Sequence, residues 1–175
     1  MVRPRCVIVV LVGTSSVTMS APFDTSDDAA DPGGDGSPSF RCSQNPADAY
    51  TAGRARTAFR VWLGEHCPVA TATAQDVLIS VNEALANAAE HAYVGTSGNV
   101  DLSARYDVIT DTLKVIVEDY GQWRPPAPTT VRRLGSRGRG IVLMRALTDD
   151  AAIEAGEEGT RVRLTWRRLT TRATN

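Results

Sequence analysis

The chain has 175 residues, of which 42% are hydrophobic and 22% are charged, and its formal net charge is −1. This composition is ordinary for a globular protein of one domain, and the balanced charge excludes the broad basic excess of most nucleic-acid-binding proteins. The three cysteines are widely spaced and form no C-x-x-C pair: Cys6, Cys42 and Cys67. They predict neither a disulfide framework nor a zinc site, which suits a reducing compartment.

The amino-terminal part of the chain differs in character from the rest. Arg3 and Arg5 precede the apolar stretch CVIVVLVG, which is similar to a secretory signal but is too short to span a bilayer. From Ala21 to Ser39 the chain is rich in Asp, Gly, Pro and Ser. This composition predicts a disordered acidic leader.

Two helices are expected next along the chain. Residues 46–65 have the alanine, arginine and leucine content of a helix, and Pro68 prevents its continuation. A second helix is expected from Thr73, with Asp76 three residues later in a capping arrangement, to about Tyr93. Its apolar residues recur at core-facing spacing: Leu78, Val81, Leu85, Ala88 and Ala92.

The opposite side of this second helix is polar. Spacing of i, i+4, i+7 and i+8 in the run VNEALANAAEHAY places four side chains on one face: Glu83, Asn87, Glu90 and His91. A carboxylate one turn before an asparagine can orient a water or hydroxyl nucleophile, while the amide oxygen ligates a hard cation such as Mg²⁺. The alternative is a solvated helix face, and this helix alone does not separate the two.

The rest of the chain predicts strands interrupted by one helix. Residues 99–106 and 113–118 alternate or run apolar and are joined by a short link, which predicts an antiparallel hairpin. A proline-rich loop leads to a helix at 141–147, and two last strands are expected at 151–155 and 161–167. The predicted fold is a two-layer α/β sandwich, with a mixed, mainly antiparallel sheet covered on one face by helices.

Two glycine-containing blocks adjoin these elements. Asp119 ends a strand and is followed by a sharp turn at Tyr120 and Gly121. Gly138 and Gly140 flank Arg139 just before the helix, and backbone amides at a helix amino terminus bind anions. An ordinary turn acid and a solvated basic loop are the structural alternatives.

Four ordered blocks resemble the GHKL, or Bergerat-fold, ATP-binding domain: VNEALANAAEHAY, LKVIVEDYGQW, RGRGIVLMRAL and GTRVRLTW. The segment from about Asn45 to Arg168 resembles the small bacterial anti-sigma-factor serine kinases of the RsbW type. The pattern E-x-x-x-N-x-x-x-H-A-Y is intact, whereas Trp123 replaces the second glycine of the family pattern D-x-G-x-G. The resemblance implies the Bergerat fold for a domain at 45–168, followed by a polar tail at 169–175.

The resemblance also implies roles for residues at the matching positions. Glu83 corresponds to the general base that polarises the attacking hydroxyl, and Asn87 to the ligand of the Mg²⁺ that bridges the ATP phosphates. Asp119 corresponds to the acceptor of a hydrogen bond from the adenine amino group. Gly121 lets the backbone approach the base, and Thr160 lies behind the adenine and supports the aspartate.

At the phosphate end, the resemblance implies backbone contacts from Gly138 and Gly140 and added positive charge from Arg137 and Arg139. His91 either contacts phosphate or holds the helix of the motif. ATP and Mg²⁺ are thus the implied cofactors.

The implied function is phosphorylation of a serine of an anti-anti-sigma, STAS-like partner with Mg-ATP, together with sequestration of a sigma factor. The alternative is a nucleotide-gated anti-sigma or regulatory binding module with little or no kinase turnover. A histidine-kinase fragment is a third option, in which His66 is the one histidine outside the motif.

The resemblance further implies a homodimer in the cytoplasm, without direct contact to nucleic acid or membrane. An ATP-dependent domain belongs inside the cell, so we expect translation to begin at Met19. Residues 1–44 are then a signal-like segment and a disordered leader outside the kinase domain.

Overall fold

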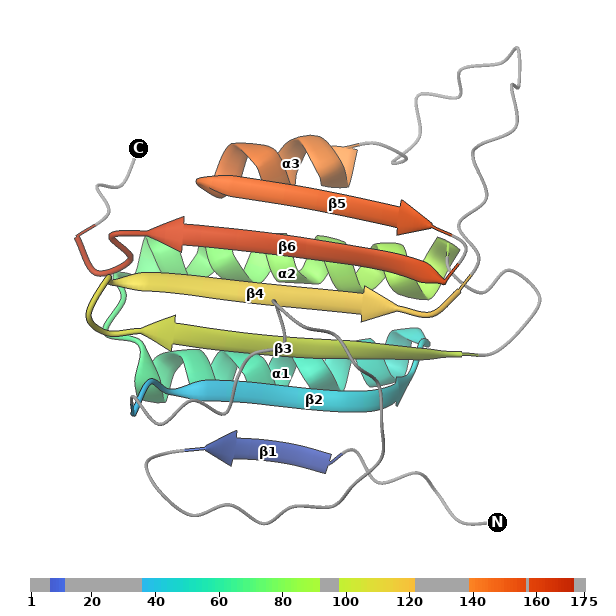
Figure 1. The fold of residues 1–175 in the computed structure, drawn as a ribbon, viewed down its shortest axis with the longest axis horizontal. Coiled ribbons are helices and arrows are strands. Elements are labelled where there is room, and N and C mark those ends of the chain that lie inside the picture. Colours follow the sequence, from blue (N-terminus) through green and yellow to red (C-terminus); the bar gives the residue numbers. More distant parts are fainter. Residues whose placement is uncertain (1–6, 12–35, 92–97, 122–138, 157, 172–175) are drawn as a thin grey trace.

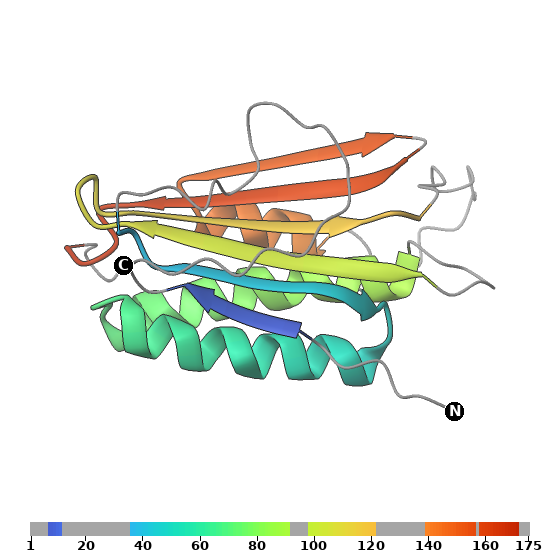
Figure 2. The same ribbon diagram turned by 60° about the horizontal axis from the view of Figure 1, so that its bottom comes forward.

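The computed structural model describes residues 7–11, 36–91, 98–121, 139–156 and 158–171 (Figure 1). In these segments, helices cover one face of a single sheet, as the turned view in Figure 2 shows. The expected two-layer α/β sandwich is confirmed. Every strand pairing in the described sheet is antiparallel. This part of the sheet is therefore purely antiparallel rather than mixed.

The sheet has the strand order β1-β2-β3-β4-β6-β5. In chain order its strands are β1 (Val7–Leu11), β2 (Ser39–Pro46), β3 (Asn99–Asp107), β4 (Thr112–Asp119), β5 (Asp150–Gly156) and β6 (Gly159–Arg167). The two expected hairpins, β3–β4 and β5–β6, are confirmed. The pairing of β4 with β6 joins them and sets Asp119 opposite Thr160.

The three helices of the described chain are α1 (Ala49–His66), α2 (Thr71–His91) and α3 (Arg139–Leu147). Asp48 caps α1 by accepting a hydrogen bond from the Thr51 backbone nitrogen at 2.7 Å. In α2 the Ala74 nitrogen already donates to the Ala70 carbonyl at 2.9 Å, and Thr73 is buried in the first turn. The expected capping arrangement at Thr73 is therefore wrong. None of the helices that the structure describes is long and apolar enough to cross a membrane.

The core lies between the sheet and the helices. Alternate residues of β3 and β4 are buried, and the helices contribute their apolar sides, including Phe59, Trp62, Val81 and Leu85. Phe59 stacks on Trp62 with 5.8 Å between ring centroids. These contacts fix α1 and α2 against the sheet and so determine which side chains face the ends of the strands.

Buried residues lie on both sides of the segment 45–168. The sequence analysis predicts no strand before α1, yet β2 carries the buried side chains of Phe40 and Cys42. At the other end Leu169 is fully buried, and its backbone nitrogen donates to the Asp111 carbonyl at 3.0 Å. Both ends are held by pairing with segments that are distant in sequence.

Candidate nucleotide-binding site

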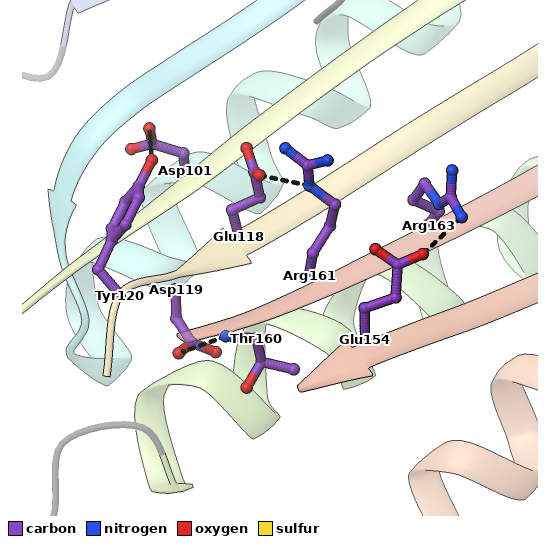
Figure 3. A network of polar contacts seen from close by, with 8 residues as sticks. All are labelled: Asp101, Glu118, Asp119, Tyr120, Glu154, Thr160, Arg161 and Arg163. Carbon is purple, nitrogen blue, oxygen red and sulfur yellow. Dashed lines mark hydrogen bonds and ion pairs between the residues drawn. The ribbon is translucent and has the colours of Figure 1, made fainter. Parts of the chain in front are cut away.

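The last pair of the β4–β6 ladder consists of Asp119 and Thr160. Asp119 is only 8% exposed, and its Oδ1 accepts hydrogen bonds from the backbone nitrogens of Gly121 at 3.2 Å and Thr160 at 3.3 Å. The Thr160 hydroxyl also lowers the pKa of this carboxylate. Figure 3 shows the two side chains next to each other at the ends of their strands. The structure thus brings together Asp119, Gly121 and Thr160.

Burial dominates the electrostatics of this carboxylate. It raises the pKa of Asp119 above its usual value of 3.8, and the hydrogen bonds from Gly121 and Thr160 lower it in part. A desolvated carboxylate with oriented donors on one side is a strong acceptor for an amino group. This chemistry suits recognition of an exocyclic amine such as that of adenine.

Gly159 is a further site residue whose role the sequence analysis did not identify. Its φ is +132°, and a Cβ atom built on it would lie 1.9 Å from the Asp119 carbonyl oxygen and 2.9 Å from the Tyr120 Cα atom. Only glycine lets the start of β6 approach the end of β4 this closely. In the sequence, the position of this glycine immediately before Thr160 is the one indication of a close backbone approach. The same position is equally typical of an ordinary turn glycine.

Glu83 and Gly140 lie in contact where α2 meets the start of α3. A Cβ atom on Gly140 would come 2.6 Å from Glu83 Oε2 and 3.6 Å from the Glu83 Cβ atom. The absence of a side chain at Gly140 therefore makes room for the half-buried Glu83 carboxylate. The sequence analysis expected Gly140 to serve phosphate approach, and the structure adds this contact with Glu83.

Asn87 follows Glu83 by one turn of α2 and is half-buried. Its amide oxygen is a suitable ligand for Mg²⁺, which commonly takes one or two protein ligands and completes its shell with phosphates and water. Among the described side chains, no group of three or more His, Cys, Asp or Glu residues could hold a metal ion. A single amide oxygen at Asn87 fits a cation that takes its other ligands from phosphates and water.

The remaining predicted site residues lie outside the description. Arg137 and Gly138 belong to the segment 122–138, as does Trp123. His91 and Arg139 lie within α2 and α3, but their side chains are not described. Their assigned roles stay predictions.

The two groups of described residues lie at one end of the sheet. Helix α2 contacts β4, β6 and α3. In Figures 1 and 2 the end of α2, the end of β4 and the starts of β6 and α3 are at the same end of the molecule. A carboxylate that binds a nucleobase and a helix amino terminus that binds phosphates can therefore contact the same extended ligand.

This fold, with helices on one face of an antiparallel sheet and a buried aspartate at the end of an inner strand, is that of the GHKL class of ATP-binding domains. Residues 45–166 match the family model of the histidine kinase-like ATPase domain, and the chain belongs to this family. The expected family is thereby confirmed.

Serine-protein kinases named RsbW are among the similar proteins. The Bacillus subtilis protein is 35% identical over 91 residues, which cover 46% of this chain and 56% of that protein. The Bacillus licheniformis protein is 32% identical over 91 residues, with the same coverage of 46% and 56%. The chain thus spans a little over half the length of the relatives it matches.

Among solved structures, the chain is similar to the RsbU and RsbW domains of a Mycobacterium tuberculosis protein. The TM-score is 0.58 at 23% identity, and the match covers 78% of this chain and 35% of that chain. At this identity the similarity concerns the fold.

Proposed function

We propose that this protein is an ATP-dependent serine kinase that phosphorylates an anti-anti-sigma partner of the STAS-like kind and sequesters a sigma factor. The observation that carries the proposal is the buried Asp119 carboxylate, held by Thr160 and Gly121 at the same end of the sheet as Glu83. Membership of the histidine kinase-like ATPase family supports it.

In this proposal Asp119 accepts a hydrogen bond from the adenine amino group, and Thr160 and Gly121 hold the carboxylate in place. The amino terminus of α3, with Gly138, Arg137 and Arg139, faces the phosphates, because exposed backbone amides and positive charge favour anions there. His91 contributes to this end or holds α2. Asn87 would hold Mg²⁺, and the ion would neutralise part of the phosphate charge when bound.

The chemical step is assigned to Glu83. Its carboxylate accepts the proton of the partner's serine hydroxyl while the serine oxygen forms a bond to the γ-phosphorus. The bond between the γ-phosphorus and the bridging oxygen breaks, and ADP leaves with that oxygen. Contact with the first turn of α3 keeps Glu83 at the phosphate end.

Glu83→Gln tests the assignment, because the amide preserves shape but removes the base. We expect ATP affinity within a few-fold of the wild type and phosphoryl transfer to the partner lowered by about 10² to 10⁴. The measurement is transfer of labelled phosphate from Mg-ATP to candidate STAS-like proteins encoded in the same genome. Transfer at the wild-type rate by the variant would contradict the role of Glu83.

A nucleotide-gated binding module is the alternative function. It predicts that the wild-type chain binds ATP and that its affinity for a sigma factor or STAS-like protein changes with nucleotide, without phosphate transfer to any partner.

We also propose that the protein works as a cytoplasmic homodimer. Light scattering of the purified chain at several concentrations measures its oligomeric state directly.

A further inference from the structure

The face of the sheet opposite the helices carries a row of charged residues next to the candidate site. Cross-strand pairing places Asp101 opposite Glu118, Glu118 opposite Arg161, and Arg161 opposite Glu154. This row is adjacent to the pair of Asp119 and Thr160. Because successive residues point to opposite faces of a sheet, the charged row lies behind the site rather than in it.

The residues on either side of Asp119 in sequence are tied to the two neighbouring strands. Arg161 Nε donates to Glu118 Oε1 at 2.6 Å, which links β4 to β6. The Tyr120 hydroxyl donates to Asp101 Oδ2 at 2.9 Å, which links the residue after β4 to β3. Figure 3 shows both contacts flanking Asp119.

We propose that Glu118 and Arg161 are positioning residues for the base of the nucleotide. Asp119 and Thr160 form the last pair of the β4–β6 ladder, so no later pair holds the two strand ends together. One pair further from that end, the ion pair of Glu118 and Arg161 joins the same two strands. It maintains the strand separation at which the Thr160 nitrogen reaches the Asp119 carboxylate at 3.3 Å, and with it the direction of the carboxylate.

Partial burial makes the pair suitable for this task. The side chains of Arg161 and Glu118 are 31% and 29% exposed, so solvent screens them less than a free surface pair. A charge-assisted hydrogen bond of this kind adds directional constraint. The inference rests on the proposed ATP site, whose binding of adenine it explains in more detail.

A second ion pair on the same face provides a matched control. Arg163 Nη2 donates to Glu154 Oε1 at 2.6 Å and links β6 to β5. Its donor and acceptor types and its length match those of the first pair. It joins β5 to β6 rather than β4 to β6, so its loss keeps the direct link between Glu118 and Arg161.

The experiment compares Glu118→Gln, Arg161→Gln and the double variant with Glu154→Gln in the full chain. We expect each single change at the first pair to weaken ATP binding about threefold to tenfold and to reduce the preference for ATP over GTP. The double variant should lose no more than either single variant, because both changes remove one interaction. Glu154→Gln should stay within about twofold of the wild type.

Two further measurements separate positioning from general stability and from the proposed function. The midpoint temperature of thermal unfolding should change by the same small amount in Glu118→Gln and Glu154→Gln. Hydrogen exchange of the Thr160 amide should become faster in Glu118→Gln only, whether or not nucleotide is present. Equal exchange at Thr160 in both variants would overturn the inference, whereas a wild-type chain that binds no ATP would overturn the proposed function.

Discussion

A single buried carboxylate, Asp119, combines a cost to stability with a role in recognition. Its pKa in the folded state is raised above the usual 3.8 by burial. The folded state therefore favours the protonated form, and the associated stabilisation is present below about pH 3.8 and lost as the pH rises through the raised pKa. At neutral pH the ionised group lowers the free energy of unfolding.

The Asp119→Asn variant should therefore be more stable than the wild type at pH 7, because it removes the buried charge. This difference should vanish below about pH 3.8, where the wild-type carboxyl is protonated in both states. ATP binding at pH 7 should weaken by roughly 1.5 to 3 kcal/mol, the range for a hydrogen bond to a charged group. Urea unfolding at both pH values and calorimetric titration with ATP measure the two effects; unchanged ATP affinity would contradict the adenine assignment.

Gly159 is the second residue whose identity the local geometry dictates. Gly159→Ala should lower the free energy of unfolding by at least about 2 kcal/mol, since the added Cβ atom would meet the Asp119 carbonyl oxygen at a positive φ. Gly156→Ala at the other end of the same hairpin turn is the control, because none of the described atoms beyond its chain neighbours lies within 4 Å of its added Cβ atom. Urea unfolding of both variants gives the comparison, and equal stabilities would show that β6 can start further from β4.

At the scale of elements, the close approach of α2 and α3 depends on Gly140. Gly140→Ala places a methyl group against the flexible end of the Glu83 side chain, which can move aside. Stability should change by less than about 1 kcal/mol, because alanine also favours the helix. Phosphoryl transfer should fall about tenfold or more, since the base is displaced.

Gly53→Ala in α1 is the matched control, because an added Cβ atom there would meet no atom of another described segment within 4 Å. It should stabilise the protein by about 0.5 to 1 kcal/mol and leave transfer unchanged. Unfolding and labelled-phosphate transfer are measured side by side. Full transfer activity in Gly140→Ala would show that the Glu83 position is not set by α3.

At the scale of the whole molecule, β1 and the site lie at different places in the sheet. Two strands, β2 and β3, separate β1 from β4. A chain that begins at Met19 lacks β1 but should fold and bind ATP within about twofold of the full chain, because its site elements remain. Calorimetric titration of both chains tests this. A loss of ATP binding by the shorter chain would show that the amino-terminal strand is required.

The sequence determined the elements whose patterns are local. The helical spacing of α2, the alternation in β3, β4 and β6, and the glycines that bound the last hairpin place these elements without reference to the rest of the chain. β2 was not predicted because SFRCSQNP has no regular apolar alternation; of its described side chains, those of Phe40 and Cys42 enter the core. Its extended form depends on pairing with β3.

Residue types and their order likewise indicated Glu83, Asn87 and Asp119 as candidate site residues. Only the tertiary structure decided that Glu83 lies against Gly140 and that Gly159 lies against Asp119. The reason is physical. Distant segments of the chain supply the backbone atoms that leave no room for a Cβ atom at Gly159. They also supply the atoms that bury Asp119 and raise its pKa. No local sequence pattern encodes these distances.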